Sequence, residues 1–436
     1  MRKVTFIGGG SAKFVTTLVR DMFTFPALRD LHITLMDIDA ARLHRTERLV
    51  NRIIDEQQLP ATVDATTDQR AALAGADYVI VTIMVGGFEK YHSDSVIPMK
   101  YGVLPTVGDT IGPGAVFRLI RTQPVLQQIA DNLREVSPHA LVLNYSNPMA
   151  MNTLALHDAG HPRVVGLCHS IQGTYRELAK WAGVPDDEID QVHYTAGGIN
   201  HVNFYLTLTY KGQNLYPMLL AKKDEILAEH PHERVRFALL EYLGHFPGEG
   251  PHHQSEYSPW FRKNEATAEE YRVETMWGYN FDMQLNEWLT AQVQKQLDGD
   301  AVEEWRRSME YGAYIVQALE TGAPLMFYGN VYNTDLITNL PRHAVVEVPC
   351  LADGNGIFPC HVGDVPPQLA SLQAQHIYVH QLALEGIKRR SRRLIRQAIQ
   401  ADPLTGAICT LPQIKALVQD MFAANAEYVR DWAPEE

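Results

Sequence analysis

A thiol and an imidazole stand side by side in the stretch GLCHSIQGT, where Cys168 precedes His169. A second histidine, His201, follows in the stretch TAGGINHVNFYL. Such side chains could fill a core, form a nucleophile with its base, or hold a metal ion. The paired CxxC motif that a zinc finger needs is absent. A metal ion held by one thiolate and one imidazole, with positions left open for substrate oxygens, fits these residue types best.

The N-terminal stretch predicts the elements that position these side chains. KVTFIGGGSAKFVTTLVRDMF reads as a strand, a glycine cluster and a helix. Gly8 and Gly10 lack Cβ atoms, so a phosphate can approach the backbone where the helix begins. The third glycine of the usual dinucleotide fingerprint is missing, because position 13 is Lys. The next strand, DLHITLMDID, ends in Asp37, which is placed to bind the ribose hydroxyls of NAD and to repel the 2′-phosphate of NADP.

Further strands are predicted at 76–87, 140–150 and 163–170, and they alternate with helices such as the one around 115–136. This alternation predicts an α/β fold with a doubly wound, parallel, Rossmann-like sheet. Ligands bind such sheets at the carboxyl ends of the strands. Gly86, Asn147 and the Cys168–His169 pair fall at those ends, so we expect them to face the cofactor crevice.

Composition narrows the class of protein. The chain has 436 residues and a net charge of −13, which argues against a nucleic-acid partner. The apolar runs are too short to span a membrane, and the N-terminus has no secretory cleavage pattern. Four cysteines are too few for a disulfide framework in a chain of this length. We therefore expect a cytoplasmic protein with reduced thiols and no membrane partner.

Several stretches together resemble the family 4 glycoside hydrolases, which are NAD- and metal-dependent glycosidases. The Cys-His-Ser form of the first stretch is similar to that of the α-galactosidase (melibiase) branch. The resemblance implies a Rossmann-like NAD-binding domain over residues 1–195, then an α+β catalytic and oligomerisation domain over 196–436, assembled as homodimers or homotetramers. The stretches that carry it occur in the family's order: FIGGGS, DTIGPGA, NYSNPMAMNT, GLCHSIQGT, GINH, SEYSPWF and NLP…VVEVPC.

The resemblance also implies a mechanism in which NAD⁺ oxidises C3 of the sugar, a base removes the C2 proton, and the leaving group departs by elimination. Water then adds, and the reduced cofactor returns the hydride. The turn from Gly8 to Ser11 and Asp37 would hold NAD⁺. Cys168 and His201 match the family's ligands for a divalent cation, and a thiolate beside sugar oxygens suits Mn²⁺.

Other roles are carried over in the same way. Tyr257 in SEYSPWF matches the base, although it could instead be a packing residue beside Trp260 and Phe261. His169 is placed to act as the acid for the leaving group. Asn147 would hold substrate hydroxyls. Asp109 and Arg118 flank GPGA and either contact cofactor or substrate or form a buried ion pair.

Alternatives remain at this stage. Within the family, an α-glucuronidase or α-galacturonidase would need an arginine or lysine for the C6 carboxylate. A 2-hydroxy acid dehydrogenase would share the first domain but has no use for a thiolate ligand, and a non-catalytic NAD sensor would need no base. The histidines of HFPGEGPHHQSE are predicted to be mostly loop residues, and the basic run KRRSRR a solvated helix face.

Overall fold

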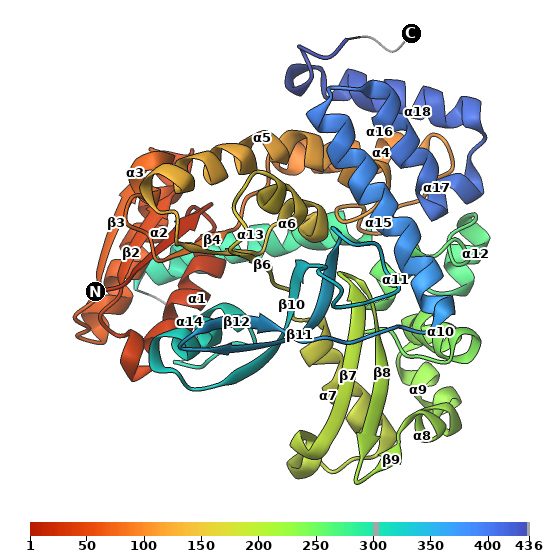
Figure 1. Cartoon of the computed structure of the whole chain (residues 1–436), viewed down its shortest axis with the longest axis horizontal. Coiled ribbons are helices and arrows are strands. Elements are labelled where there is room, and N and C mark those ends of the chain that lie inside the picture. Colours follow the sequence, from red (N-terminus) through yellow and green to blue (C-terminus); the bar gives the residue numbers. More distant parts are fainter. Residues whose placement is uncertain (300–304, 434–436) are drawn as a thin grey trace.

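Six parallel strands form the N-terminal half of the sheet in the computed structural model, which describes residues 1–299 and 305–433 (Figure 1). Their order, β3-β2-β1-β4-β5-β6, is that of dinucleotide-binding folds. The predicted α/β class and the Rossmann-like parallel sheet are therefore confirmed. The strands are β1 (Lys3–Ile7), β2 (His32–Met36), β3 (Thr62–Thr66), β4 (Tyr78–Val81), β5 (Leu141–Asn144) and β6 (Val164–Gly166).

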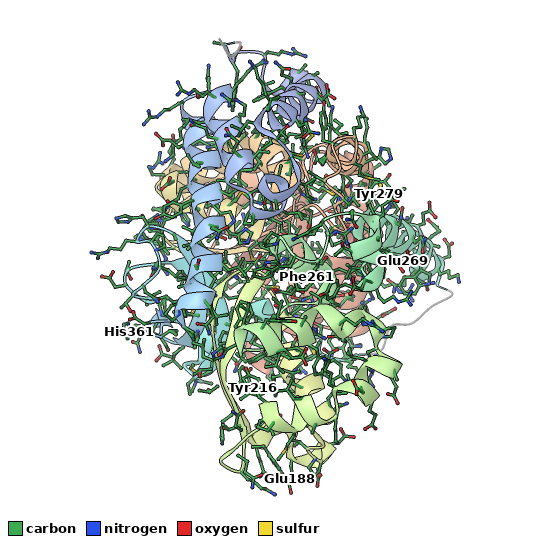
Figure 2. All side chains as sticks on the ribbon, turned by 90° about the vertical axis from the view of Figure 1, so that its right-hand side faces the viewer. Glu188, Tyr216, Phe261, Glu269, Tyr279 and His361 are labelled. Carbon is green, nitrogen blue, oxygen red and sulfur yellow. The ribbon has the colours of Figure 1, made fainter. Side chains whose placement is uncertain are left out.

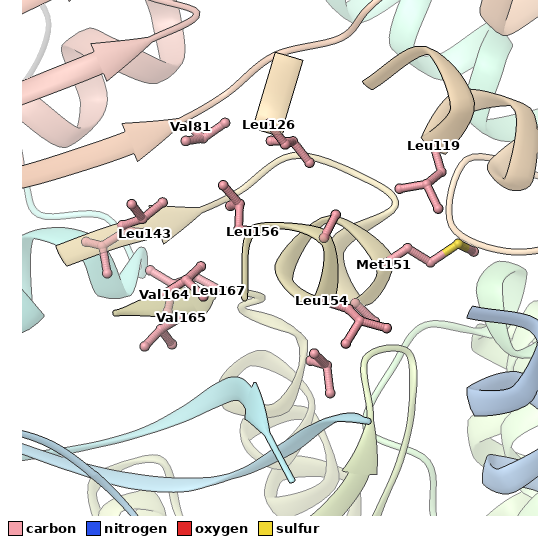
Figure 3. Close-up of a cluster of buried hydrophobic side chains, with 14 of the residues drawn as sticks. Val81, Leu119, Leu126, Leu143, Met151, Leu154, Leu156, Val164, Val165 and Leu167 are labelled. Carbon is pink, nitrogen blue, oxygen red and sulfur yellow. The ribbon is translucent and has the colours of Figure 1, made fainter. Parts of the chain in front are cut away.

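Helices cover both faces of this half, which is why the central strands YVIV and LVLN are buried along their whole length. Figure 3 shows part of the resulting core, where Val81 and Leu143 of the strands lie near Leu126 and Leu156 of the helices. The helices are α1 (Ala12–Phe23), η1 (Pro26–Leu28), α2 (Ala40–Glu56), α3 (Gln69–Leu73), α4 (Gly87–Met99), α5 (Gly112–Val136), α6 (Met149–Asp158) and α7 (Ser170–Ala182).

The sheet continues into a second, antiparallel half. From β6 the order runs β10-β11-β7-β8-β9, and β12 pairs with β11. The strands are β7 (Val192–Ile199), β8 (Val202–Tyr210), β9 (Gln213–Asn214), β10 (Leu325–Tyr332), β11 (Val345–Asp353) and β12 (Gly356–Pro359). The division predicted between residues 195 and 196 falls inside β7 and stays a prediction.

Two narrow connections flank the β10–β11 ladder, one where the two halves meet and one inside the second half. β6 pairs with β10 through Gly166 and Asn330 alone, and β11 pairs with β7 through Glu347 and Gly198 alone. Asn330 and Glu347 are themselves partners in the long β10–β11 ladder. We call these four residues the seam of the sheet.

The remaining helices pack around the second half and over the first. Figure 2 shows Phe261 near the middle of the molecule and Glu188 at its lower end, before β7. The elements are η2 (Asp186–Gln191), α8 (Tyr216–Ala221), α9 (Lys223–Glu229), η3 (Pro231–Glu233), α10 (Arg234–Leu243), α11 (Pro251–Tyr257), α12 (Glu265–Glu270), α13 (Trp277–Asp298), α14 (Tyr311–Thr321), α15 (Pro367–Lys388), α16 (Arg392–Ala401), α17 (Pro403–Ile408), α18 (Leu411–Ala424) and η4 (Ala426–Tyr428).

Two surface features complete the fold. Helix α13 lies against the N-terminal half, where Arg52 of α2 donates to the carbonyl of Gln296. The basic run is exposed over Lys388–Arg390, as predicted, whereas Arg392 lies over the ring of Phe422. Within the described ranges, no helix is both long and apolar enough to cross a membrane.

Candidate active site

Three potential metal ligands meet where the two halves of the sheet join. Cys168 follows β6, His201 lies in the turn between β7 and β8, and Glu249 precedes α11. Cys168 Sγ lies 3.8 Å from His201 Nε2 and 3.7 Å from Glu249 Oε2. His201 Nε2 lies 3.2 Å from Glu249 Oε2. The structure thus brings the two predicted ligands together and adds a carboxylate that sequence reasoning missed.

The protonation states of this cluster suit a cation. Burial lowers the pKa of His201 to about 4, so its imidazole is neutral at pH 7. Burial opposes ionisation of Glu249, but its attraction to the imidazoles of His201 and His253 outweighs burial and lowers the pKa of Glu249 to about 2. Burial, together with Glu249, raises the pKa of the Cys168 thiol well above its ordinary value. A bound cation would displace that proton, and one sulfur, one nitrogen and one oxygen form a donor set that fits a first-row divalent ion.

His201 is held in a backbone conformation that is uncommon for its residue type. Its φ is +66°, in the left-handed region. Gln254 of α11 donates to the carbonyl of His201, and Gln373 of α15 donates to the carbonyl of Val202 at 2.9 Å. The turn that presents the imidazole is therefore fixed from two helices.

The cluster opens into a cavity of about 1350 Å³ at the carboxyl ends of the parallel strands. Asn147 lines it and donates from Nδ2 to Asp109 Oδ2 at 2.7 Å. Arg118 Nη1 lies 3.9 Å from the same oxygen, and the Asp109 and Arg118 side chains are each only 9% exposed. Arg118 Nε and Nη1 and Asp109 Oδ1 have no hydrogen-bond partner in the part of the chain that the structure describes. The pair is thus a loose, buried ion pair that keeps donors and an acceptor free for a ligand.

His169 lines the same cavity beside an acid. Its Nδ1 lies 3.2 Å from Glu310 Oε1, and its side chain is 59% exposed. The hydrogen bond to Glu310 raises the pKa of His169 above its ordinary value. The imidazole can therefore carry a proton into the cavity near neutral pH.

Tyr257 ends α11 and is 2% exposed. Its ring lies 6.1 Å from that of His201 and 4.8 Å from that of His376. Burial raises its pKa well above the ordinary value. Two histidine rings, one of them from a potential metal ligand, therefore lie beside Tyr257, and among the described residues no ring contact joins it to Trp260 or Phe261, its neighbours in the alternative packing role.

Glu256, next to Tyr257, organises the loop in front of it. Its buried Oε1 accepts from the backbone N–H groups of Thr106, Val107 and Gly108 at 2.6, 2.9 and 2.9 Å. This fan of bonds ties α11 to the loop that leads into Asp109. Glu256 of the SEYSPWF stretch therefore links α11, which carries the candidate base Tyr257, to the loop that precedes the candidate binding residue Asp109.

The glycine turn, residues 8–11, is held by close contacts with the residues that follow β2 and β4. Gly8 has a φ of +96°, and a Cβ there would lie 2.4 Å from the carbonyl oxygen of Thr82. Asp37 Oδ2 accepts from the backbone N–H of Gly10 at 2.8 Å. Ser11 is the residue before α1, as predicted.

Gly86 and α13 border the same region. Gly86 precedes α4 in a left-handed conformation, with the stem of Lys90 packed where its Cβ would lie. Residues 10–13 and the α13 side chains Asn286, Leu289 and Thr290 line a cavity of about 110 Å³. The turn is therefore faced by α13.

The prediction that the histidines of HFPGEGPHHQSE are mostly loop residues is wrong for two of the three. His252 and His253 lie in α11, because Pro251 begins a helix there after Gly250. The His253 ring is 4.1 Å from that of His201, and His252 stacks on Trp277 at 4.1 Å. The signal for the missed Glu249 was a carboxylate between two glycines directly before this helix start.

Comparison with known proteins defines the class. Residues 3–184 match the family 4 glycosyl hydrolases, and residues 196–405 match the C-terminal domain of that family. The chain therefore belongs to family 4 of the glycosyl hydrolases and is an enzyme.

Individual relatives refine this placement. An α-galactosidase of Bacillus subtilis is 36% identical over 439 residues, covering 100% of both chains. An α-galactosidase of Rhizobium meliloti is 34% identical, covering 99% of this chain and 90% of the relative. An α-galacturonidase of Lachnoclostridium phytofermentans is 29% identical, covering 99% of this chain and 97% of the relative.

Solved structures agree on the fold. A putative glucosidase of Bacillus subtilis superposes with a TM-score of 0.87 at 25% identity, covering 97% of this chain and 99% of the other. A 6-phospho-α-glucosidase from gut microorganisms, solved in complex with NAD and Mn²⁺, gives a TM-score of 0.81 at 19% identity, with 98% of each chain covered.

Proposed function

We propose that the chain is an α-galactosidase that cleaves neutral galactosides with NAD⁺ and Mn²⁺ as cofactors. The observation that carries the proposal is the charge of the cavity. Seven carboxylates and four arginines line it, in addition to Cys168 and the histidines. The Mn²⁺ ion and a protonated His169 would offset most of this negative excess, but no surplus of positive charge is left to attract a uronide or a sugar phosphate, whereas a neutral sugar needs none. The carboxylates are Asp109, Glu177, Glu233, Glu249, Glu274, Asp282 and Glu310.

The arginines support the same choice, because most are already paired. Arg236 is bound by Glu233 and Glu177, and Arg118 lies beside Asp109. Arg176 pairs with Asp190 at 3.6 Å. Arg272 is the lining arginine whose side chain has no ion-pair partner in the described ranges. It favours the second candidate, an α-galacturonidase, in which it would bind the C6 carboxylate.

The cofactors are supported by the donor set and by the neighbouring structure that holds both. Cys168, His201 and Glu249 would hold the metal ion, and the turn from Gly8 to Ser11 with Asp37 would hold NAD⁺. When bound, NAD⁺ supplies reversible oxidation of the sugar, and the divalent ion supplies Lewis-acid stabilisation of negative charge on oxygen.

The chain's own side chains supply binding and proton transfer. Asn147, Asp109 and Arg118 line the cavity with free donors and acceptors that bind sugar hydroxyls. Tyr257 removes the proton from C2, and the packing of its ring against those of His201 and His376 holds the phenol in place. His169, kept protonated by Glu310, donates a proton to the departing oxygen.

A panel of p-nitrophenyl glycosides tests the substrate. We expect release of nitrophenol from the α-galactoside only when NAD⁺, Mn²⁺ and a thiol reductant are all present, with little release from the β-galactoside or the α-galacturonide. Arg272→Gln should leave galactoside cleavage unchanged. Faster cleavage of the galacturonide, lost in Arg272→Gln, would establish the second candidate instead.

We further propose a homodimer or homotetramer in a reducing, cytoplasmic environment. Phe281 and Trp288 on α13 are 48% and 56% exposed, which is unusual for large apolar side chains. All four cysteines are free thiols. Light scattering during gel filtration would measure the assembly, and a monomer at micromolar concentration would exclude it.

A further inference from the structure

A row of buried residues crosses the sheet directly behind the metal-ligand cluster. Gly166 of β6 pairs with Asn330 of β10, which pairs with Glu347 of β11. Glu347 pairs with Gly198 of β7, and Gly198 with Asn203 of β8. The row therefore contains the whole seam and extends it by one strand.

Glu347 is the centre of this row. Its side chain is 0% exposed, and no arginine or lysine of the described residues forms an ion pair with it. Its Oε1 accepts from Asn330 Nδ2 at 3.2 Å, and its Oε2 accepts from Asn203 Nδ2. Asn330 Nδ2 also lies 3.4 Å from the carbonyl oxygen of Gly166. One carboxyl group thus joins the strands on both sides of the seam.

Each ligand-bearing segment is attached to this row. Gly166 precedes Cys168 by two residues, and Gly198 precedes His201 by three. The third segment is attached through Asn203, whose carbonyl accepts from the N–H of Gly248 at 3.0 Å. A Cβ on Gly248 would lie 2.0 Å from Asn203 Oδ1, so the residue before Glu249 has room for no side chain.

A carboxyl group at this buried position carries a free-energy cost. Burying it without a counter-charge disfavours the charged form, and burial raises the pKa of Glu347 to about 8. A leucine would fill the same space without that penalty. What the carboxyl adds is two acceptors that hold two amides, and through them the spacing of the ligand segments.

We propose that Glu347 is a positioning residue of the metal site: through Asn203 and Asn330 it sets the separation of Cys168, His201 and Glu249 and hence the affinity for the ion. This role rests on the metal ion of the proposed function. Glu347 touches neither ion nor substrate, so its effect is indirect.

The test compares variants that separate bulk from hydrogen bonding. Glu347→Leu keeps the bulk and removes both acceptors, whereas Glu347→Gln keeps a polar group of the same shape. Asp402→Leu is the matched control, because Asp402 is a carboxyl that is 1% exposed and accepts from Thr405, away from the ligand segments. Thermal unfolding verifies that each variant is folded.

Two readouts without substrate or NAD⁺ report on the site. Electron paramagnetic resonance of free Mn²⁺ gives the dissociation constant, and the thiolate-to-metal absorption of the Co²⁺-loaded protein reports on the Cys168–metal bond. We expect Glu347→Leu to bind Mn²⁺ roughly 10- to 100-fold more weakly and to lose the cobalt band. Asp402→Leu should behave like the wild type, and Glu347→Gln, which keeps one of the two acceptor oxygens, should lie between the wild type and Glu347→Leu.

A folded Glu347→Leu variant with wild-type affinity and an unchanged cobalt band would overturn the positioning role alone. If Glu347→Leu does not fold, Asn330→Ala takes its place in the test. We expect this variant to lose less Mn²⁺ affinity than Glu347→Leu would, and wild-type Mn²⁺ affinity would overturn the positioning role of Glu347. A wild-type protein that binds no Mn²⁺ would overturn the metal in the proposed function, and this role with it.

Discussion

The glycine turn and the metal-ligand cluster lie at the same edge of one sheet but are assembled in different ways. The turn is local to the parallel half of the sheet: Gly8, after β1, lies against Thr82, after β4, and Asp37, after β2, accepts from the N–H of Gly10. The cluster takes one ligand from each of three segments, Cys168 before the seam and His201 and Glu249 beyond it. A local site survives if the parallel half folds, whereas an assembled site also requires that the two halves of the sheet join in register.

Removal of the metal ion should have the largest effect and should separate the two sites. We expect chelation to abolish glycoside cleavage and Mn²⁺ to restore it, with loss in air reversed by a thiol reductant because Cys168 is oxidisable. NAD⁺ binding, followed by calorimetry, should persist, because the turn shares no ligand with the cluster. Loss of NAD⁺ binding on chelation would show that the two sites are not independent. Full activity without bound metal would show that catalysis needs no metal ion.

Tyr257→Phe tests the base within the assembled site. It removes the phenol and keeps the ring packing, so kcat should fall by roughly 10²–10⁴-fold while the protein stays folded. Hydrolysis by the wild type in D₂O should place deuterium at C2 of the released sugar, as mass spectrometry or NMR can show. Tyr271→Phe is the control, since Tyr271 packs on Phe261 at 4.7 Å in the same region. Near-normal turnover of Tyr257→Phe would show that another residue acts as the base.

Asp37→Ala tests the local site. Removing this acceptor should weaken NAD⁺ binding by roughly 10- to 100-fold, the cost of a hydrogen bond to a charged group. It should also narrow the expected preference for NAD⁺ over NADP⁺, with Mn²⁺ affinity unchanged. Asp39→Ala is the control, because Asp39 caps α2 through Ala41 and Arg42. It should cost about 1 kcal/mol of stability and no affinity. Unchanged NAD⁺ binding in Asp37→Ala would show that the turn alone holds the cofactor.

Acid stability tests the second half of the molecule. His380 on α15 is 4% exposed, and burial lowers its pKa to about 3. Between its ordinary value of 6.5 and that value, the unfolded chain takes up a proton that the folded chain does not. Stability should therefore fall as the pH falls through this window. His380→Leu should reduce the slope by about 1.4 kcal/mol per pH unit, measured by urea unfolding at pH 6 and 5. An unchanged slope would mean that His380 is protonated in the folded state.

Sequence reasoning reached the local features more fully than the assembled ones. The roles of Gly8, Gly10 and Asp37 could be predicted from one continuous strand–turn–helix–strand stretch, residues 3–37. Cys168 and His201 could be paired because each follows a predicted element. Glu249 could not, because its place depends on the contact of Gly248 with Asn203. The histidine neighbours of Tyr257 were equally hidden, since His376 comes from α15, more than a hundred residues away.

The narrow seam has a thermodynamic consequence. The bridge of Gly166 with Asn330 that joins the halves is a single one, and the ligands on either side of it would be joined by one ion. A ligand that binds only the apposed halves stabilises that arrangement by about 2.7 kcal/mol at 100 times its dissociation constant. The supply of metal would then set the temperature at which the chain melts, which should rise with the concentration of the ion.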